Sequence, residues 1–195
     1  MRISIAFACV VVFAAFPLFS GRGAESSEER RIEDRLARAR HKVDDMMLTS
    51  DDAKELVKKS RAYIARAETA LANHHTAFAG PLSEAAEALS LAIDHVVRSR
   101  DVTLTDYPSR QRLSYRLDAV GMRVKQADYF QKLGGDSTAR GLVGLARRYN
   151  DRAREAYHQG KRRETDEYAT TADEIVRALE YIAQAHKFSG NGRPG

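Results

Sequence analysis

The chain has 195 residues, of which 43% are hydrophobic and 30% charged, with 32 Lys and Arg against 27 Asp and Glu. This composition is apolar enough to bury a core, which excludes a chain disordered throughout, and the length suits one domain or two very small ones. The single cysteine excludes an intramolecular disulfide and a zinc site built from cysteines.

The first residues have the composition of an export signal. After the basic residue Arg2, the stretch 3–19 contains no charged side chain, and small residues follow it. A positive start, an apolar stretch and a small-residue exit are typical of a secretory signal peptide. The stretch is also short for a bilayer span, which needs about 20 apolar residues. The sequence therefore predicts a signal peptide over residues 1–23 and a periplasmic or extracellular mature protein.

The cleavage position and the fate of the signal stay open. Gly23 is the preferred last residue of the signal, with Ser20 and Ala24 as alternatives, because Arg22 interrupts the small-residue pattern. The other alternative is an uncleaved N-terminal anchor, since the apolar stretch is close to the length of a span. Cleavage after Gly23 removes Arg2 and Arg22 and no acidic residue, so the net charge falls from +5 to +3. This mild charge argues against a nucleic-acid partner, and we expect no transmembrane span after cleavage.

The rest of the chain has the periodicity of amphipathic helices. No Gly or Pro lies between Gly23 and Gly80, and apolar or small residues recur there in steps of three and four. This spacing keeps them on one side of a helix, and no segment alternates with a period of two long enough to predict a strand. We expect an all-α fold over residues 24–188, an elongated bundle of about six amphipathic helices, followed by a disordered tail over residues 189–195. The recurring residues are Ile32, Leu36, Ala39, Val43 and Met46 in the first stretch and Leu113, Leu117, Val120, Val124 and Ala127 in a later one.

Capping chemistry predicts where the helices begin and end. Ser, Thr and Asp accept hydrogen bonds from the first amides of a helix, Gly tolerates the left-handed backbone that ends one, and Pro is favoured at the first helical position. On these signals Pro81 and Pro108 each begin a helix, and Gly134 ends one. The predicted helices cover residues 27–47, 51–73, 81–98, 108–134, 136 or 137 to 159, and 165–187.

The second half of the chain resembles the first. A shift of 86 positions lays residues 56–97 on residues 142–183 without a gap, and nine positions then carry the same residue type, among them Tyr63 with Tyr149. The start signals of the helices align as well. A repeat of this length indicates duplicated supersecondary structure, so we expect two tandem three-helix units, although amphipathic helices also resemble one another without duplication. The predicted units cover residues 27–99 and 108–187.

Four residues form a candidate metal or cofactor site. His74 and His75 follow the second predicted helix, and His158 ends the fifth, one turn after Glu155. If the two units pack about a pseudo-twofold axis, the three rings either meet or lie at opposite ends, and the sequence does not choose between these arrangements. A di-iron bundle needs two Glu-x-x-His steps and this chain has one, while a ring at a helix C-terminus is already favourable to the helix dipole. The structural interpretation is therefore preferred, and no cofactor is expected.

The most basic stretch holds the candidate anion-binding residues. These are Arg147, Arg148, Arg152 and Arg154. Their guanidinium groups would suit phosphate or a lipid headgroup. Acidic residues are interspersed among them, however, so an ion-paired and solvated face is the interpretation that we prefer.

No catalytic motif is present in the sequence. It lacks glycine-rich phosphate loops, a Gly-x-Ser-x-Gly elbow, a His-Glu-x-x-His metal motif and a Cys-x-x-Cys-His haem attachment. Long amphipathic helices without a ligand-rich core leave their exposed faces for function. We therefore expect a non-catalytic binding, adaptor or structural module whose partner is another envelope or secreted protein or an anionic surface, with a homo-oligomer also open. The alternatives are a metal or cofactor carrier that uses His74, His75 and His158 and, least favoured, an enzyme whose site lies outside known motifs.

Overall fold

The computed structural model describes residues 22–44, 50–101, 107–134 and 137–190, which form six helices and no strand. The prediction of an all-α helical bundle is confirmed. The helices are α1 (Arg22–Asp44), α2 (Asp51–Ala72), α3 (Thr76–Arg98), α4 (Arg110–Gly134), α5 (Arg140–His158) and α6 (Arg162–Gly190).

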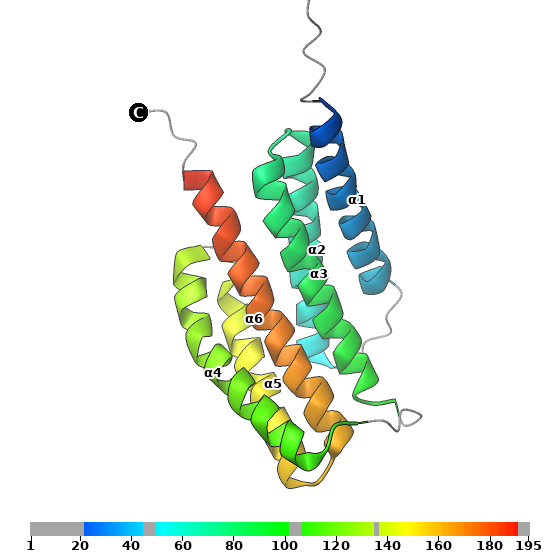
Figure 1. The fold of residues 1–195 in the computed structure, drawn as a ribbon, viewed down its shortest axis with the longest axis vertical. Coiled ribbons are helices and arrows are strands. Elements are labelled where there is room, and N and C mark those ends of the chain that lie inside the picture. The colour runs from blue at the N-terminus through cyan, green and yellow to red at the C-terminus, as the bar shows by residue number, and fades with distance from the viewer. Residues whose placement is uncertain (1–21, 45–49, 102–106, 135–136, 191–195) are drawn as a thin grey trace, which may run out of the picture.

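The helices form two triplets that lie side by side (Figure 1). α1 and α2 pack against α3, whereas α4 and α5 pack against α6. The contact between α3 and α6 is the most extensive of all helix pairs and joins the triplets. These two helices run antiparallel, because His95 near the end of α3 contacts Glu167 near the start of α6, while Phe78 and His186 meet at the opposite ends.

The predicted apolar stripes form the core. The stripe residues of α1 and α4 that lie in the described ranges are at most 4% exposed, and Met46 lies outside those ranges. Alanines on α3 let its neighbours approach closely. The hydroxyl of Ser60 on α2 donates to the carbonyl of Ala86 at 3.2 Å, and that of Thr171 on α6 lies 3.5 Å from the carbonyl of Ala92. α3 is therefore the central helix of the first triplet.

Burial follows the predicted repeat. When α2 is shifted by 86 positions onto the second triplet, each of its buried residues falls on a buried residue. Amphipathic helices also match in this way without duplication, so the duplication stays a prediction. The pairs are Ala53 with Ala139, Leu56 with Leu142, Val57 with Val143, Ser60 with Ala146, Tyr63 with Tyr149, Ile64 with Asn150, Ala67 with Ala153 and Ala70 with Ala156.

Several predicted helix ends are wrong. α3 begins at Thr76, so Pro81 lies inside the helix and is buried instead of opening it. Helical hydrogen bonds already start at His75, whose carbonyl accepts from the amides of Phe78 and Ala79 at 3.0 and 2.9 Å. Because one proline near a helix start removes a single amide donor, packing on the core outweighs this loss.

The remaining differences lie at the chain ends and the later helices. α1 begins at Arg22, which places two residues of the predicted signal in a helix, and residues 1–21 lie outside the described ranges. α4 and α5 begin a few residues later than predicted. α6 begins at Arg162 and continues to Gly190, so the first two residues of the predicted disordered tail are helical, while residues 191–195 are not described.

None of the described helices combines the length and the apolar character that crossing a bilayer requires. Residues 1–21 lie outside the described ranges, so the predicted signal peptide and the alternative anchor stay predictions.

Candidate functional site

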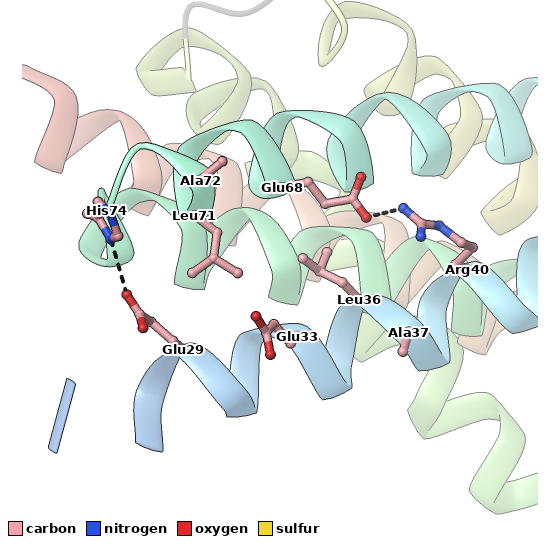
Figure 2. Close-up of a pocket in the computed structure, with 9 residues that line it drawn as sticks. All are labelled: Glu29, Glu33, Leu36, Ala37, Arg40, Glu68, Leu71, Ala72 and His74. Atoms are coloured by element: carbon pink, nitrogen blue, oxygen red, sulfur yellow. Dashed lines mark hydrogen bonds and ion pairs between the residues drawn. The ribbon is translucent and has the colours of Figure 1, made fainter. Parts of the chain in front are cut away.

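A groove of about 480 Å³ lies between the middle turns of α1 and the last turns of α2 (Figure 2). Its floor is apolar: Leu36 is 4% exposed, and Leu71 packs on the core. Ala37 and Ala72 line the groove with small side chains. α1 packs more extensively on α3 than on α2, which leaves space between the first two helices. A groove of this volume falls in the range that binds small ligands or side chains.

The rim of the groove is acidic. At one end the Nδ1 atom of His74 lies 3.6 Å from the Oε1 atom of Glu29, and at the other end Arg40 pairs with Glu68. Glu33 is exposed between these pairs, on the face that Figure 2 shows toward α2, and makes no ion pair within the described ranges. Glu29, Glu33 and Glu68 bring three carboxylates to this rim, more than the cationic side chains of Arg40 and His74, so the groove favours a positively charged group.

The groove continues along the two helices. A second hollow of about 260 Å³ shares Arg40 and Glu68 with the first one and extends to the ion pair between Arg61 and Asp44, at 2.8 Å. From Glu29 to Asp44 the helical rise gives a length of about 22 Å. The depression is thus elongated along α1, and a chain-like ligand fits this shape better than a compact one.

His74 adopts a strained backbone conformation beside the groove. Its φ of 58° is the only positive value at a non-glycine residue in the described ranges. The amide of His74 donates to Leu71, and that of His75 donates to Ala70, both at 2.9 Å, which is the Schellman arrangement that ends α2. The same arrangement ends α5, but there Gly160 takes the left-handed position, with φ of 73°. The two positions are 86 residues apart, so the repeat places a histidine where glycine relieves the strain.

The second triplet carries larger or oppositely charged side chains at the corresponding positions. Under the 86-residue shift, Tyr157 stands in the place of Leu71 and Arg154 in that of Glu68. The guanidinium of Arg110 lies over the Tyr157 ring, 5.2 Å from its centroid. The open, acidic groove is therefore a property of the first triplet's own side chains and does not follow from the shared fold.

The candidate metal residues lie at opposite ends of the bundle. His74 and His75 are in the turn between α2 and α3, next to the end of α6. His158 and Glu155 are at the turn before α6, and α6 separates the two ends by about 35 Å of helical rise. No group of three or more His, Cys, Asp or Glu side chains suited to a metal ion occurs in the described ranges. Joint metal binding would require these ends to meet, so we do not propose it.

The candidate anion-binding arginines face two different helices. Arg148 and Arg152 both bind Asp52 at the start of α2, at 2.8 and 2.5 Å. Arg147 pairs with Asp128 on α4, at 2.5 Å, and Arg154 donates to a backbone carbonyl of the same helix. This stretch therefore has the ion-paired character that the interspersed acidic residues indicate, and it presents no convergent cluster.

A buried acid–histidine pair holds the two triplets together. The Nδ1 atom of His95 lies 2.6 Å from the Oε2 atom of Glu167, with side chains 19% and 4% exposed. Arg98 also approaches this carboxylate, at 3.6 Å. Two turns further along α6, burial raises the pKa of the Glu174 carboxyl, although its pairing with Arg177 opposes this effect. His95 lies on α3 and Glu167 on α6, so we assign this pair to the contact between the two helices.

Sequence reasoning missed the groove residues. Glu29, Glu33, Arg40 and Glu68 sit on the polar side of their helices and look like ordinary solvated charges. The one available signal was His74, which aligns with Gly160 at a predicted helix end. A residue other than glycine at such a position indicates backbone strain, and strained residues cluster at functional sites.

Comparison with known proteins assigns the groove to no family. No family model, no curated protein and no solved structure matches the chain.

Proposed function

We propose that this protein is an exported, non-catalytic binding module that holds a basic, amphipathic segment of another envelope or secreted protein in the α1–α2 groove. The observation that carries the proposal is the strained His74 at the rim, where the corresponding turn of the second triplet has Gly160. Residues in sparsely populated backbone conformations cost stability and cluster at ligand sites. His74 lines the groove with its ring 3.6 Å from Glu29, so we assign its strained conformation to the groove and not to the stability of the turn.

The proposed partner follows from shape and charge. An elongated apolar floor accepts side chains that recur every three or four residues along one face of a helix. The excess of carboxylates on the rim selects Lys or Arg beside those apolar side chains and repels acidic segments. An anionic surface is a poorer fit, because the arginines predicted to bind one are engaged by Asp52, Asp128 and a backbone carbonyl.

Export is the second component of the proposal. It rests on the basic start, the uncharged stretch 3–19 and the small residues that follow. Sequencing the N-terminus of the protein recovered outside the cytoplasm should give residue 24 first, with 21 and 25 as the alternatives. A first residue of Met1 would contradict cleavage.

The binding proposal is tested with a labelled amphipathic peptide of leucine and lysine, followed by fluorescence anisotropy. We expect saturable binding, and about fivefold weaker binding after Glu33→Gln, because an exposed ion pair contributes up to about 1 kcal/mol. Glu33 makes no ion pair in the described ranges, so this change leaves the fold intact.

Two controls make the experiment specific. Asp34→Asn removes the same charge from the next residue of α1, which does not line the groove, and should leave the affinity unchanged. A peptide of leucine and glutamate with the same length should bind poorly. Equal affinity for the two peptides, or no loss after Glu33→Gln, would contradict the assignment of the groove.

A further inference from the structure

α4 carries a second apolar face that no other helix covers in the described ranges. Its first face, which includes Leu117 and Val124, is buried in the core. On the opposite side, Tyr115, Met122 and Tyr129 are 67%, 65% and 62% exposed. Single exposed apolar residues are common, but a row of large ones along a helix indicates an interaction surface.

These residues have the spacing of a coiled-coil seam. Tyr115, Met122 and Tyr129 are separated by seven residues each, and a second row follows four residues after each of them. The second row consists of Ala119, Gln126 and Leu133, and all three side chains are exposed. This is the alternation of a and d positions through which two helices interlock.

We propose that this face, the α4 seam, binds the α4 seam of a second copy of the chain in antiparallel orientation. The antiparallel register pairs Tyr115 with Leu133 and Met122 with Gln126 of the other copy, and the twofold axis repeats each pair. It also places Tyr129 opposite Ala119, a large side chain against a small one, as close packing requires. A parallel register would instead set each tyrosine against its own copy and alanine against alanine.

Charges beside the seam favour the same register. Asp118 precedes Ala119, and Lys132 precedes Leu133, so the antiparallel register brings each Asp118 next to Lys132 of the other copy. Neither side chain makes an ion pair within the described ranges. Lys125 meets its own copy near the axis, at an exposed position where the repulsion is screened. On this flank two attractive pairs therefore oppose the repulsion between the Lys125 side chains. On the other flank Arg123 also meets its own copy, but each Arg123 is already paired with Asp173 and Glu180 of its own α6.

The size of the seam predicts a weak dimer. α4 has 25 residues, a length of about 37 Å, and with a helix diameter of about 11 Å it offers about 400 Å² per copy. Stable interfaces bury about 800 Å² per partner. We therefore expect a dissociation constant in the micromolar range, with monomer at nanomolar concentrations.

The first test measures mass against concentration by sedimentation equilibrium on the protein with its native N-terminus. Wild type should dimerise, and Met122→Glu should raise the dissociation constant at least tenfold, because it would bury a charge in the seam. Since Met122 is 65% exposed, the change should not affect folding. Phe188→Glu, at an exposed apolar residue of α6, is the matched control and should leave the dimer unchanged. Monomer at all concentrations, or a dimer that survives Met122→Glu, would overturn the proposal.

The second test addresses the register. Asp118→Lys should weaken the dimer about tenfold, and adding Lys132→Asp should restore it. The two positions are 14 residues apart on one helix, about 21 Å, so they do not interact within a copy. Failure of the double variant to recover would exclude the antiparallel register. The groove proposal is unaffected by either result, because the seam and the groove lie on different triplets.

Discussion

At the residue scale, the turn between α2 and α3 shows a conflict between local and tertiary requirements. A left-handed conformation costs a residue other than glycine about 1–2 kcal/mol. His74 bears this cost while its ring, 83% exposed, pairs with Glu29. An exposed pair of this kind contributes little to folding, so the histidine is not explained by stability.

His74→Gly should raise the free energy of unfolding by about 1 kcal/mol, because glycine adopts a positive φ without steric cost. Urea unfolding followed by circular dichroism measures this change. The same variant should bind the leucine–lysine peptide less tightly, since it removes a groove side chain.

Gly160→Ala is the matched control at the turn that ends α5. Nothing lies within 4 Å of the added methyl group, so the expected loss of about 1 kcal/mol comes from the backbone alone. If His74→Gly destabilised the protein, the strain interpretation and the argument for the groove would both be contradicted.

Tyr149 is a second residue whose environment has a measurable consequence. Its ring is fully buried, and its hydroxyl has no hydrogen-bond partner in the described part of the chain. Burial raises the pKa of the hydroxyl to about 12, and the nearby Arg152 guanidinium only partly opposes this effect.

The raised pKa of Tyr149 predicts a loss of stability at alkaline pH. Between pH 10 and 12 the unfolded chain releases this proton while the folded chain keeps it, so stability falls as pH rises. The single-site loss from pH 9 to pH 11 is about 1.4 kcal/mol. Tyr149→Phe should remove this part of the pH dependence.

The Tyr149→Phe comparison also tests the unsatisfied hydroxyl. At pH 7 the variant should be as stable as wild type or up to about 1 kcal/mol more stable, because no hydrogen bond is lost. Urea titrations of both proteins at pH 7, 9 and 11 provide the measurement. Equal pH slopes in the two proteins would show that Tyr149 ionises at an ordinary pKa.

At the element scale, helix starts were predictable where a side chain caps the helix. α2 begins at Asp51 as predicted, because Ser50 has extended backbone angles and its hydroxyl accepts from the amide of Ala53 at 3.3 Å. α3 begins earlier than predicted because burial of its first turns on the core outweighs the signal of Pro81. Caps are local and visible in sequence, whereas packing against another helix is not.

The contact between α3 and α6 depends on small residues. Ala92 is fully buried, and its carbonyl lies 3.5 Å from the Thr171 hydroxyl of α6. Ala92→Leu should therefore lower the free energy of unfolding by about 1–3 kcal/mol through overpacking, measured by urea unfolding. Ala77→Leu, at an exposed position of the same helix, should change it by less than about 0.5 kcal/mol. Similar effects at both sites would contradict close packing of α3 on α6.

At the scale of the whole molecule, the two triplets have similar burial and different surfaces. The first has an open acidic groove, and the second has the exposed α4 seam. Two cores with similar burial and separate surfaces suit a module that would bind a partner on one triplet and its own copy on the other. The peptide titration tests the groove of the first triplet, and sedimentation equilibrium tests the α4 seam of the second.

The extensive α3–α6 contact predicts that both triplets unfold together. Circular dichroism reports helix throughout the chain, and tyrosine fluorescence, unobscured because Trp is absent, reports the local environments. We expect the two urea curves to coincide in a single transition. Two separated transitions would mean that the triplets are independent and that the His95–Glu167 pair does not couple them.

The sequence by itself determined the helical class and the apolar stripes that form the core. These properties follow from the spacing of apolar residues along single helices, which is local and periodic. Only the tertiary structure placed Glu33 and Glu68 across one groove, separated His74 from His158, and left Met122 uncovered. Such relations depend on which helix lies against which, and the periodicity of one helix does not encode its neighbour.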